Sequence, residues 1–540
     1  MGFLSKLKAD SASSHSHHDT HLEFDDGNTV DGPVKFLTWR SFIMGLCVSM
    51  GGFIFGYSTG QVSGFTSMDD FKERFAAYND VTGEYYFSNV RNGLIVGLLS
   101  IGTMIGALVA APIADRIGRK YSMTFWSLMN MIGIIIQIAS KDGNWVQVAM
   151  GRWVMGLGVG ALTSICPMYQ SESAPKQVRG AMVSAFQLFC AFGILISDIV
   201  NFGTERLHNT GAWRITMGIG FAWPLVLGIG CFFLPESPRY AFRHGQTEYA
   251  RETMCKLYGL PANHRIIREE MNEMKISLEH EQAIGQAAWY EIFTAPAILS
   301  RTLIGMALQS IQQLTGCNFL FYYGTSIFAG IGISNPFVTP IILGAVNFVM
   351  TLPGLYVADH YGRRNSLMIG GVWMFICFMI WSSVGHEILE INISDKPAGT
   401  AAIIFTCFFI CGFATTWGPM IWAICGEMYP DRYRATCMGL STATNWLWNF
   451  LISFFTPFIS SAIDYEYGYV FACCSLLGVF IVFFFVNESR GRTLEEVDTM
   501  YVLGVRPWQS ANWVMPDRNN LAKETEHSDS TAAEVSEEKQ

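Results

Sequence analysis

The sequence contains few charged residues for its length. They make up 15% of its 540 residues, whereas about 25% is typical of soluble domains. Hydrophobic residues make up 51%. A chain of this composition cannot cover its surface with charge, so lipid must cover much of it. The composition therefore excludes an ordinary soluble globular protein.

Signals of secretion, metal binding and catalysis are also missing. No apolar segment precedes residue 40, so a cleaved signal peptide is not indicated. Every cysteine except Cys255 lies in or beside an apolar run, and no paired C-x-x-C spacing occurs, so we expect neither disulfides nor a metal site. No Ser-His-Asp set or phosphate loop is present. We therefore expect no enzyme activity, no cofactor and no nucleic-acid partner.

Long apolar runs dominate the sequence instead. Runs of about 18 residues or more indicate membrane-spanning helices, and there are twelve: 41–63, 92–114, 121–140, 145–168, 180–201, 213–234, 301–325, 338–358, 366–384, 400–424, 435–458 and 466–486. Six lie on each side of a polar stretch near 235–299. The pattern predicts an all-α integral membrane protein of twelve transmembrane helices in two six-helix halves.

Three motifs occur twice, about 250 residues apart. The pairs are Asp115-Arg116-Ile117-Gly118-Arg119-Lys120 with Asp359-His360-Tyr361-Gly362-Arg363-Arg364, Glu172-x-x-Pro175-x-x-x-Arg179 with Glu427-x-x-Pro430-x-x-x-Arg434, and Glu236-Ser237 with Glu488-Ser489. Duplicated halves related by an axis along the membrane normal are typical of secondary transporters, whose substrate site lies between the halves at mid-membrane.

These features divide the chain into five segments. We expect a disordered N-terminal tail (1–39), a six-helix half (40–234), a central loop with short helices (235–299), a second six-helix half (300–487) and a C-terminal tail (488–540). The excess of Lys and Arg in alternate gaps predicts that both termini and the central loop are cytoplasmic. The histidines of the first tail, His15, His17, His18 and His21, are not expected to form a metal site.

The loops carry weaker signals. Thr247 to His280 mixes apolar residues with paired charges at helical spacing, which predicts short amphipathic helices. Asn79 to Asn89 has the character of an exposed outer loop. Asn392-Ile393-Ser394 is a glycosylation sequon on the outer side, and the sequence leaves open whether it is used.

Polar residues within the apolar runs are candidates for function because burying them in lipid is costly. The richest series, Gln309, Gln312, Gln313, Thr315-Gly316 and Asn318, lies in one run. The three glutamines share one helix face, whereas Asn318 joins them only if Thr315-Gly316 interrupts the helix. Amides supply both a donor and an acceptor. This arrangement favours a neutral, hydroxyl-rich ligand over an ion.

Other runs offer matching groups. They are Gln187, Asn347, Trp422, Asn445, Trp446 and Asn449, with Asn445 and Asn449 one helical turn apart. Amides can also simply join membrane helices to one another. Six or more amides spread over four helices, together with two tryptophans, favour a cavity for a sugar, whose C–H patches stack on rings.

The repeated charged motifs place acids beside bases. The expected pairs are Asp115 with Arg119, Glu172 with Arg179, Asp359 with Arg363, and Glu427 with Arg434, and Glu236 and Glu488 lie in the third repeat. The basic residues could serve only to anchor the topology. Alternatively, the pairs form a latch that holds one of two conformations.

Taken together, the motifs resemble the sugar porter family of the major facilitator superfamily, and fungal hexose transporters most of all. The resemblance rests on Pro167-x-Tyr169-x-x-Glu172-x-x-Pro175-x-x-x-Arg179-Gly180, Pro235-Glu236-Ser237-Pro238-Arg239, the series from Gln309 to Asn318 followed by Tyr322-Tyr323, and Gly491-Arg492-Thr493-Leu494-Glu495-Glu496. It covers roughly residues 40–500. It implies that Gln187, Gln312, Gln313, Asn318, Asn347, Trp422 and Asn449 contact a monosaccharide, that Tyr322 and Tyr323 form an outer gate, and that the charged motifs form an inner latch.

One departure from the family pattern concerns energy coupling. Many members have Asp where this chain has Ser58, and in proton-coupled relatives that Asp is implicated in coupling. Asp198 is the one obvious carboxylate left in the membrane, about 16 Å from Gln187 on the same helix face. It is a candidate proton carrier, or else an interfacial residue in contact with water.

We therefore expect a plasma-membrane hexose transporter, with glucose the first candidate, that works by alternating access and facilitated diffusion. Proton-coupled symport and a sugar sensor are the alternatives. The expected partners are a monosaccharide, membrane lipid and, for symport, protons.

Overall fold

The computed structural model describes residues 38–514 except 81–82, 176–177, 285–289, 295–297, 329–334, 390–391, 393–394 and 493. Residues 1–37 of the expected N-terminal tail (1–39), with its histidine cluster, and residues 515–540 of the expected C-terminal tail (488–540) lie outside the described residues. The chain forms two compact units. The N-terminal unit comprises Met1–Tyr86 and Leu98–Ala287, and the C-terminal unit comprises Phe87–Gly97 and Ala288–Gln540.

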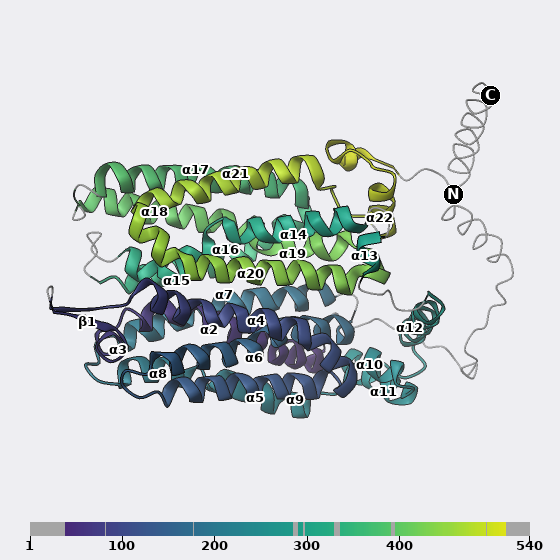
Figure 1. The fold of residues 1–540 in the computed structure, drawn as a ribbon. Helices are drawn as coiled ribbons and strands as arrows, with labels where there is room; N and C mark the ends of the chain where they lie inside the picture. Colours follow the sequence, from purple (N-terminus) through teal and green to yellow (C-terminus); the bar gives the residue numbers. More distant parts are fainter. Residues whose placement is uncertain are drawn as a thin grey trace, which may run out of the picture. The chain divides into compact units, whose positions relative to one another are not determined.

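The N-terminal unit is built from long helices that run side by side (Figure 1). They are α2 (Trp39–Phe65), α4 (Asn89–Ile117), whose first residues belong to the C-terminal unit, α5 (Arg119–Ile138), α6 (Trp145–Ser173), α7 (Arg179–Thr204), α8 (Gly211–Ile219) and α9 (Ala222–Phe233). Small residues let α2 and α7 pack backbone to backbone: a Cβ on Gly56 would overlap the Cys190 carbonyl. Close packing through glycine is how membrane helices associate.

One end of this unit carries a short helix and a hairpin. Helix α3 (Asp69–Phe75) is followed by β1 (Ala77–Asn79) and β2 (Glu84–Tyr86), which pair antiparallel with Tyr78 opposite Tyr85. The expected exposed loop from Asn79 to Asn89 contains β2, whose residues are all exposed, and ends at the start of α4. Tyrosines favour strands, but three residues per strand are too few to show a reliable period in the sequence.

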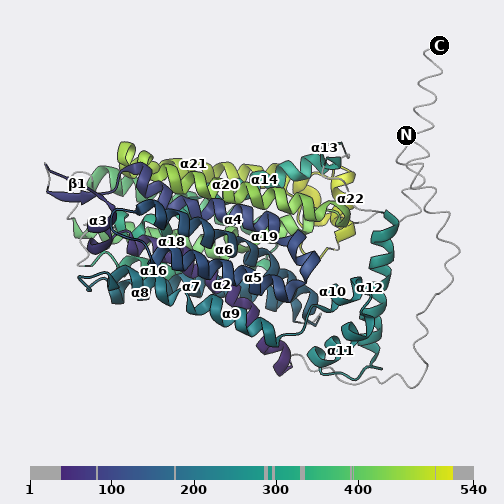
Figure 2. The same ribbon diagram turned by 60° about the horizontal axis from the view of Figure 1, so that its bottom comes forward.

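The opposite end of the same unit carries three more helices, α10 (Pro238–Arg243), α11 (Thr247–Tyr258) and α12 (Arg265–Ile284). Helix α12 runs across the direction of the bundle helices (Figure 2). The predicted amphipathic helices of Thr247 to His280 are confirmed. The hydroxyls of Thr38 and Ser41, at the start of α2, both donate to the Leu257 carbonyl, which ties α11 to the bundle.

The C-terminal unit repeats the pattern of long helices. It contains α13 (Glu291–Thr294), α14 (Ile298–Leu314), α15 (Cys317–Ile327), α16 (Val338–His360), α17 (Arg363–Val384), the π-helical turn η2 (Gly385–Leu389), α18 (Lys396–Gly412), the π-helical turn η3 (Phe413–Trp417), α19 (Gly418–Met428), α20 (Asp431–Ile463), the 3₁₀ turn η4 (Asp464–Glu466), α21 (Tyr467–Phe485), α22 (Leu494–Val502) and the 3₁₀ turn η5 (Pro507–Asn512).

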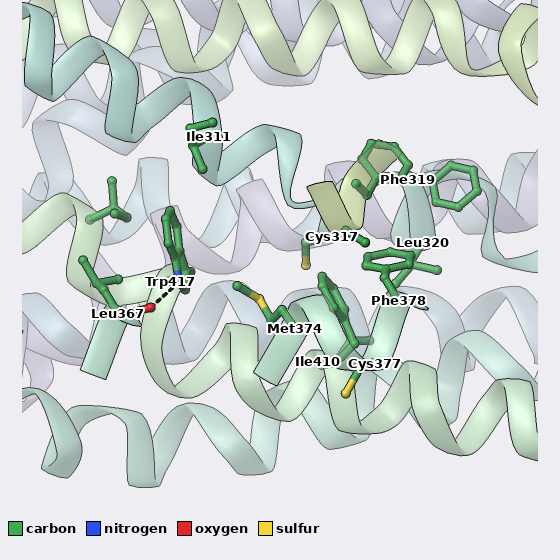
Figure 3. Close-up of a cluster of buried hydrophobic side chains, with 14 of the residues drawn as sticks. Ile311, Cys317, Phe319, Leu320, Leu367, Met374, Cys377, Phe378, Ile410 and Trp417 are labelled. Carbon is green, nitrogen blue, oxygen red and sulfur yellow. Dashed lines mark hydrogen bonds between the residues drawn. The ribbon is translucent and has the colours of Figure 1, made fainter. Parts of the chain in front are cut away.

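The predicted seventh span is interrupted at Gly316, which separates α14 from α15. Gly316 has a φ of 88°, a left-handed conformation that is costly for any residue with a Cβ. Its Cβ would also lie 2.7 Å from Phe471. The adjacent core includes Cys317, Phe319, Phe378 and Trp417, whose indole N–H donates to the Leu367 carbonyl at 2.9 Å (Figure 3).

The predicted spans correspond to helices of the described chain. Ten helical runs within it are long and apolar enough to cross a membrane, and one of them, Arg432–Phe485, contains both α20 and α21. Helices α14 and α15 are each too short to be counted in that way and together make the seventh predicted span. The all-α membrane class is thus confirmed, with the small hairpin as an addition.

Candidate functional site

A connected group of amides lies where the interrupted helix meets α20. Gln313, at the end of α14, donates from Nε2 to Asn445 Oδ1 at 2.9 Å. Its Oε1 accepts from Asn318 at 2.6 Å and from Asn449 at 3.2 Å. The break at Gly316 therefore brings Asn318 beside Gln313, which a continuous helix would not do.

Asn445 connects Gln313 to two further glutamines of α14, Gln309 and Gln312. Its Nδ2 lies 2.7 Å from Gln309 Oε1 and 2.8 Å from Gln312 Oε1. Gln312 donates to the carbonyls of Trp417 and Gly418 at 2.9 and 3.0 Å. Both Nε2 hydrogens of Gln312 are thus used within the protein, whereas its Oε1 accepts one hydrogen bond and can accept a second. Gln309 was not among the predicted contact residues, although it lies on the same face as Gln312 and Gln313.

These contacts determine what the group can do chemically. Gln312 is 4% exposed and Gln313 is 8% exposed, whereas Asn318 is half-buried. The amides hold one another in fixed orientations, so that the second Nε2 hydrogen of Gln313, whose Oε1 already accepts twice, and the Oδ1 of Asn318 point in defined directions. Such a preorganised set of neutral donors and acceptors suits a ligand rich in hydroxyl groups.

Two tyrosines of α15 extend this group. Tyr322 donates to Asn449 Oδ1 at 3.1 Å, and Tyr323 donates to the Ser453 carbonyl at 2.6 Å. Both rings are buried and both hydroxyls are bound to α20. Movement of α15 would therefore have to break two hydrogen bonds, which fits a gating role.

Three predicted contact residues lie outside the hydrogen-bonded group. Asn347, on α16, is 8% exposed, and Trp422, on α19, is half-buried. Gln187, on α7, is half-buried and belongs to the N-terminal unit.

A charged cluster lies where α5, α6 and α10 of the N-terminal unit meet. Arg119 Nε and Nη2 each lie 3.0 Å from one oxygen of Glu172, and Arg119 also pairs with Asp115 at 3.0 Å. Glu236 accepts from the backbone N–H groups of Arg119 and Lys120 at the start of α5. Burial raises the pKa of Glu236, and those N–H donors oppose the rise.

The C-terminal unit contains the same arrangement. Arg363 lies 2.7 Å from Glu427, and Glu488 accepts from the backbone N–H groups of Arg363 and Arg364 at 2.9 and 3.1 Å. In both units a glycine of positive φ, Gly118 or Gly362, precedes the basic residue. Without a Cβ, each glycine lets the glutamate reach the positive end of the helix.

Two of the expected pairings are wrong. Glu172 and Glu427 bind Arg119 and Arg363 rather than Arg179 and Arg434. Arg179 instead donates to the Ala174 carbonyl and Arg434 to the Tyr429 carbonyl. Spacing within one motif suggested partners that are close in the sequence. Folding instead brings Glu172 beside the motif that contains Arg119, and Glu427 beside the motif that contains Arg363. The Asp359 side chain lies outside the described residues.

Asp198 is buried in α7, with 4% of its surface exposed. In this conformation the side chain therefore does not face bulk solvent. Its Oδ2 has no hydrogen-bond partner within the described part of the chain. Ser58, at the position where many relatives have Asp, is likewise 4% exposed.

A family model described as "Sugar (and other) transporter" matches residues 44–501. The chain belongs to this sugar transporter family. Among curated relatives, the high-affinity glucose transporter ght2 of Schizosaccharomyces pombe is 44% identical over 88% of this chain and 89% of its own length. The low-affinity glucose transporter HXT3 of Saccharomyces cerevisiae is 46% identical over 86% and 83%, respectively.

Other relatives broaden the comparison. The S. pombe protein ght8, named a probable high-affinity hexose transporter, mitochondrial, is 44% identical over 89% of this chain and 87% of its own length. The proton:xylose symporter XylE bound to 6-bromo-6-deoxy-D-glucose has a TM-score of 0.71 at 24% identity, covering 86% of this chain and 99% of XylE. This likeness shows the major facilitator fold. As a member of the sugar transporter family, the chain is a transporter and not an enzyme.

Proposed function

We propose that this protein carries a monosaccharide, with glucose the first candidate, across the plasma membrane by alternating access. The observation that carries the proposal is the amide group built around Gln313 on an interrupted helix. The names of the glucose-transporting relatives support glucose as the substrate. The proposed contacts are Gln187, Gln312, Gln313, Asn318, Asn347, Trp422, Asn445 and Asn449.

We assign the remaining groups by their contacts. Tyr322 and Tyr323 act as a gate because their hydroxyls join α15 to α20. The charged clusters act as an inner latch on the cytoplasmic side, where both termini lie. Each cluster joins the start of one helix to carboxylates of two other segments, so separation of those segments requires breaking it.

Facilitated diffusion is the proposed mode because Ser58 cannot carry a proton. Proton-coupled symport is the second candidate, favoured by the buried, partly unsatisfied carboxyl of Asp198. A carrier can use a proton gradient only if a titratable group has different proton affinity in the two conformations.

Uptake of radiolabelled glucose by yeast cells that lack their own hexose transporters tests the function. We expect saturable uptake that equalises a non-metabolised glucose analogue across the membrane. Surface expression without uptake, combined with glucose-dependent signalling, would instead establish a sensor. Accumulation that a protonophore abolishes would establish symport.

A further inference from the structure

A cavity of about 250 Å³ lies in the N-terminal unit, apart from the amide group. It forms where α10, α11 and α12 meet the ends of α5, α6 and α7. Pockets for drug-sized ligands measure about 300–1,000 Å³. The cavity therefore suits a small ligand. The transport proposal uses Arg119 and Glu172 of its lining for the latch, but it assigns no ligand to the cavity.

The walls of the cavity carry an excess of positive charge that the protein does not neutralise. Four arginines and three glutamates line it. Glu172 is occupied by Arg119 and by the Ser237 hydroxyl. Arg179 and Arg239 form no ion pair with a carboxylate in the described part of the chain, and the Nε of Arg179 is buried without a partner there. Two guanidinium groups are thus available to an anion.

One residue of the lining has an unused acceptor. Glu270, on α12, is 8% exposed, and its Oε2 accepts from the Tyr258 hydroxyl at 2.6 Å. Its Oε1 is buried and has no donor among the described residues. A buried carboxylate oxygen without a donor is costly. A ligand that supplies a hydroxyl would remove that cost.

Arg179, Arg239, Tyr258 and Glu270 line the same cavity. Burial and the charge of Glu270 raise the pKa of Tyr258, so its hydroxyl stays protonated and keeps Oε2 occupied. Arg179 and Arg239 act on the same hydroxyl in the opposite direction. Both guanidinium groups are therefore within electrostatic reach of the Tyr258–Glu270 pair.

We propose that this cavity binds a phosphate ester that also carries hydroxyl groups, with the phosphate on Arg179 and Arg239 and a hydroxyl on Glu270 Oε1. Guanidinium groups bind phosphate oxygens through charge-assisted, often bidentate hydrogen bonds. A soluble hexose phosphate and the headgroup of an inositol phospholipid both have this chemistry. Inorganic phosphate has the anion but lacks the carbon-bound hydroxyls.

Binding here would act on transport through Arg119 and Glu172, which line the same cavity. A phosphate beside Arg119 competes with Glu172 for its guanidinium and so weakens that ion pair. This consequence rests on the proposed latch, whereas the binding itself does not. With a soluble hexose phosphate as the ligand, the product of sugar phosphorylation would adjust the rate of its own supply.

Binding is measured directly with the purified full-length protein in detergent micelles, by titration calorimetry with glucose 6-phosphate and with inorganic phosphate. We expect saturable binding of glucose 6-phosphate that Arg239→Ala weakens roughly tenfold, since one charge-assisted contact is lost. Glu270→Gln should weaken glucose 6-phosphate more than inorganic phosphate. Arg265→Ala, an exposed residue of α12 paired with Glu269, is the matched control and should bind as the wild type does.

A second arm identifies the source of the ligand. Vesicles of phosphatidylcholine with and without phosphatidylinositol 4-phosphate are floated with the protein, and Arg239→Ala is compared with Arg265→Ala. Retention that depends on the inositol lipid and on Arg239, without glucose 6-phosphate binding, assigns the site to a lipid headgroup. If neither ligand binds saturably, or if binding is unchanged in Arg179→Ala and Arg239→Ala, the proposal is wrong. Glucose uptake measured without added phosphate ester tests transport separately.

Discussion

Arg119 and Glu172 lie side by side, with two N–O distances of 3.0 Å, although they belong to two different motifs and are 53 residues apart in the sequence. Arg363 and Glu427 have the same relationship in the C-terminal unit, through one contact of 2.7 Å. Arg119 is 3% exposed. Because removing one partner of a buried pair leaves the other charge uncompensated, any conformation that separates them is disfavoured.

Arg119→Gln should lower the maximal rate of transport while leaving the binding of an outward-facing ligand intact. The substitution removes the charge that Glu172 and Asp115 require, so the conformation held by the pair loses population. Glucose uptake kinetics and ligand binding to purified protein measure the two effects separately. Arg116→Gln is the control, because Arg116 is an exposed residue of the same motif. Loss of binding with normal turnover of the remaining sites would refute the latch role.

Gln313→Ala should raise the apparent KM for glucose about fivefold or more, because a hydrogen bond contributes on the order of 1 kcal/mol. It also frees Asn318, Asn445 and Asn449 from their shared partner. Uptake over a range of glucose concentrations measures the change, with surface expression quantified in parallel. Gln147→Ala removes an amide that donates to the Ile136 carbonyl in the other unit, and it should leave the KM unchanged.

Gln312→Ala should reduce stability more than Gln313→Ala, because it leaves two buried backbone carbonyls without their donor, whereas Asn318, one partner of Gln313, is half-buried. The Gln312 amide binds two carbonyls and Asn445, so truncation leaves several buried groups unsatisfied, at roughly 1–3 kcal/mol each. Thermal unfolding of the purified protein should therefore show a lower Tm for Gln312→Ala than for Gln313→Ala. Equal Tm values would show that the two amides have equivalent roles.

Gly316→Ala should destabilise the helix break. The left-handed conformation costs a residue with a Cβ roughly 1–2 kcal/mol, and the new methyl would press against Phe471. We expect a lower Tm and a raised KM, because the position of Asn318 depends on the break. Gly324→Ala, in α15, the helix that follows the break, would place its Cβ 3.9 Å from its nearest neighbour and should change neither quantity.

We expect glucose uptake to have no proton-coupled component, because the proposed mode is facilitated diffusion. Asp198→Asn should therefore leave uptake unchanged. The measurement is accumulation of a non-metabolised glucose analogue with and without a protonophore. Asp142→Asn, an exposed partner of Arg74, is the control. Protonophore-sensitive accumulation in the wild type that disappears only in Asp198→Asn would overturn facilitated diffusion and identify the proton carrier.

The sequence by itself determined the class, the number of spans and the family, because these follow from hydrophobic runs and repeated motifs that need no knowledge of contacts. It also located the interruption at Gly316, since only a break could bring Asn318 to the face of Gln312 and Gln313. The central amphipathic helices followed from their charge spacing.

Tertiary structure alone decided which partners meet. Glu172 could reach either Arg119 or Arg179 as far as spacing shows, and packing of α5 against α6 selected Arg119. Gln309 and the carbonyls of Trp417 and Gly418 joined the amide group because η3 and α20 approach α14 in space. The burial of Asp198 and the cavity beneath α12 likewise depend on segments far apart in the chain. Periodicity reports which face of a helix is polar, but only packing determines what that face touches.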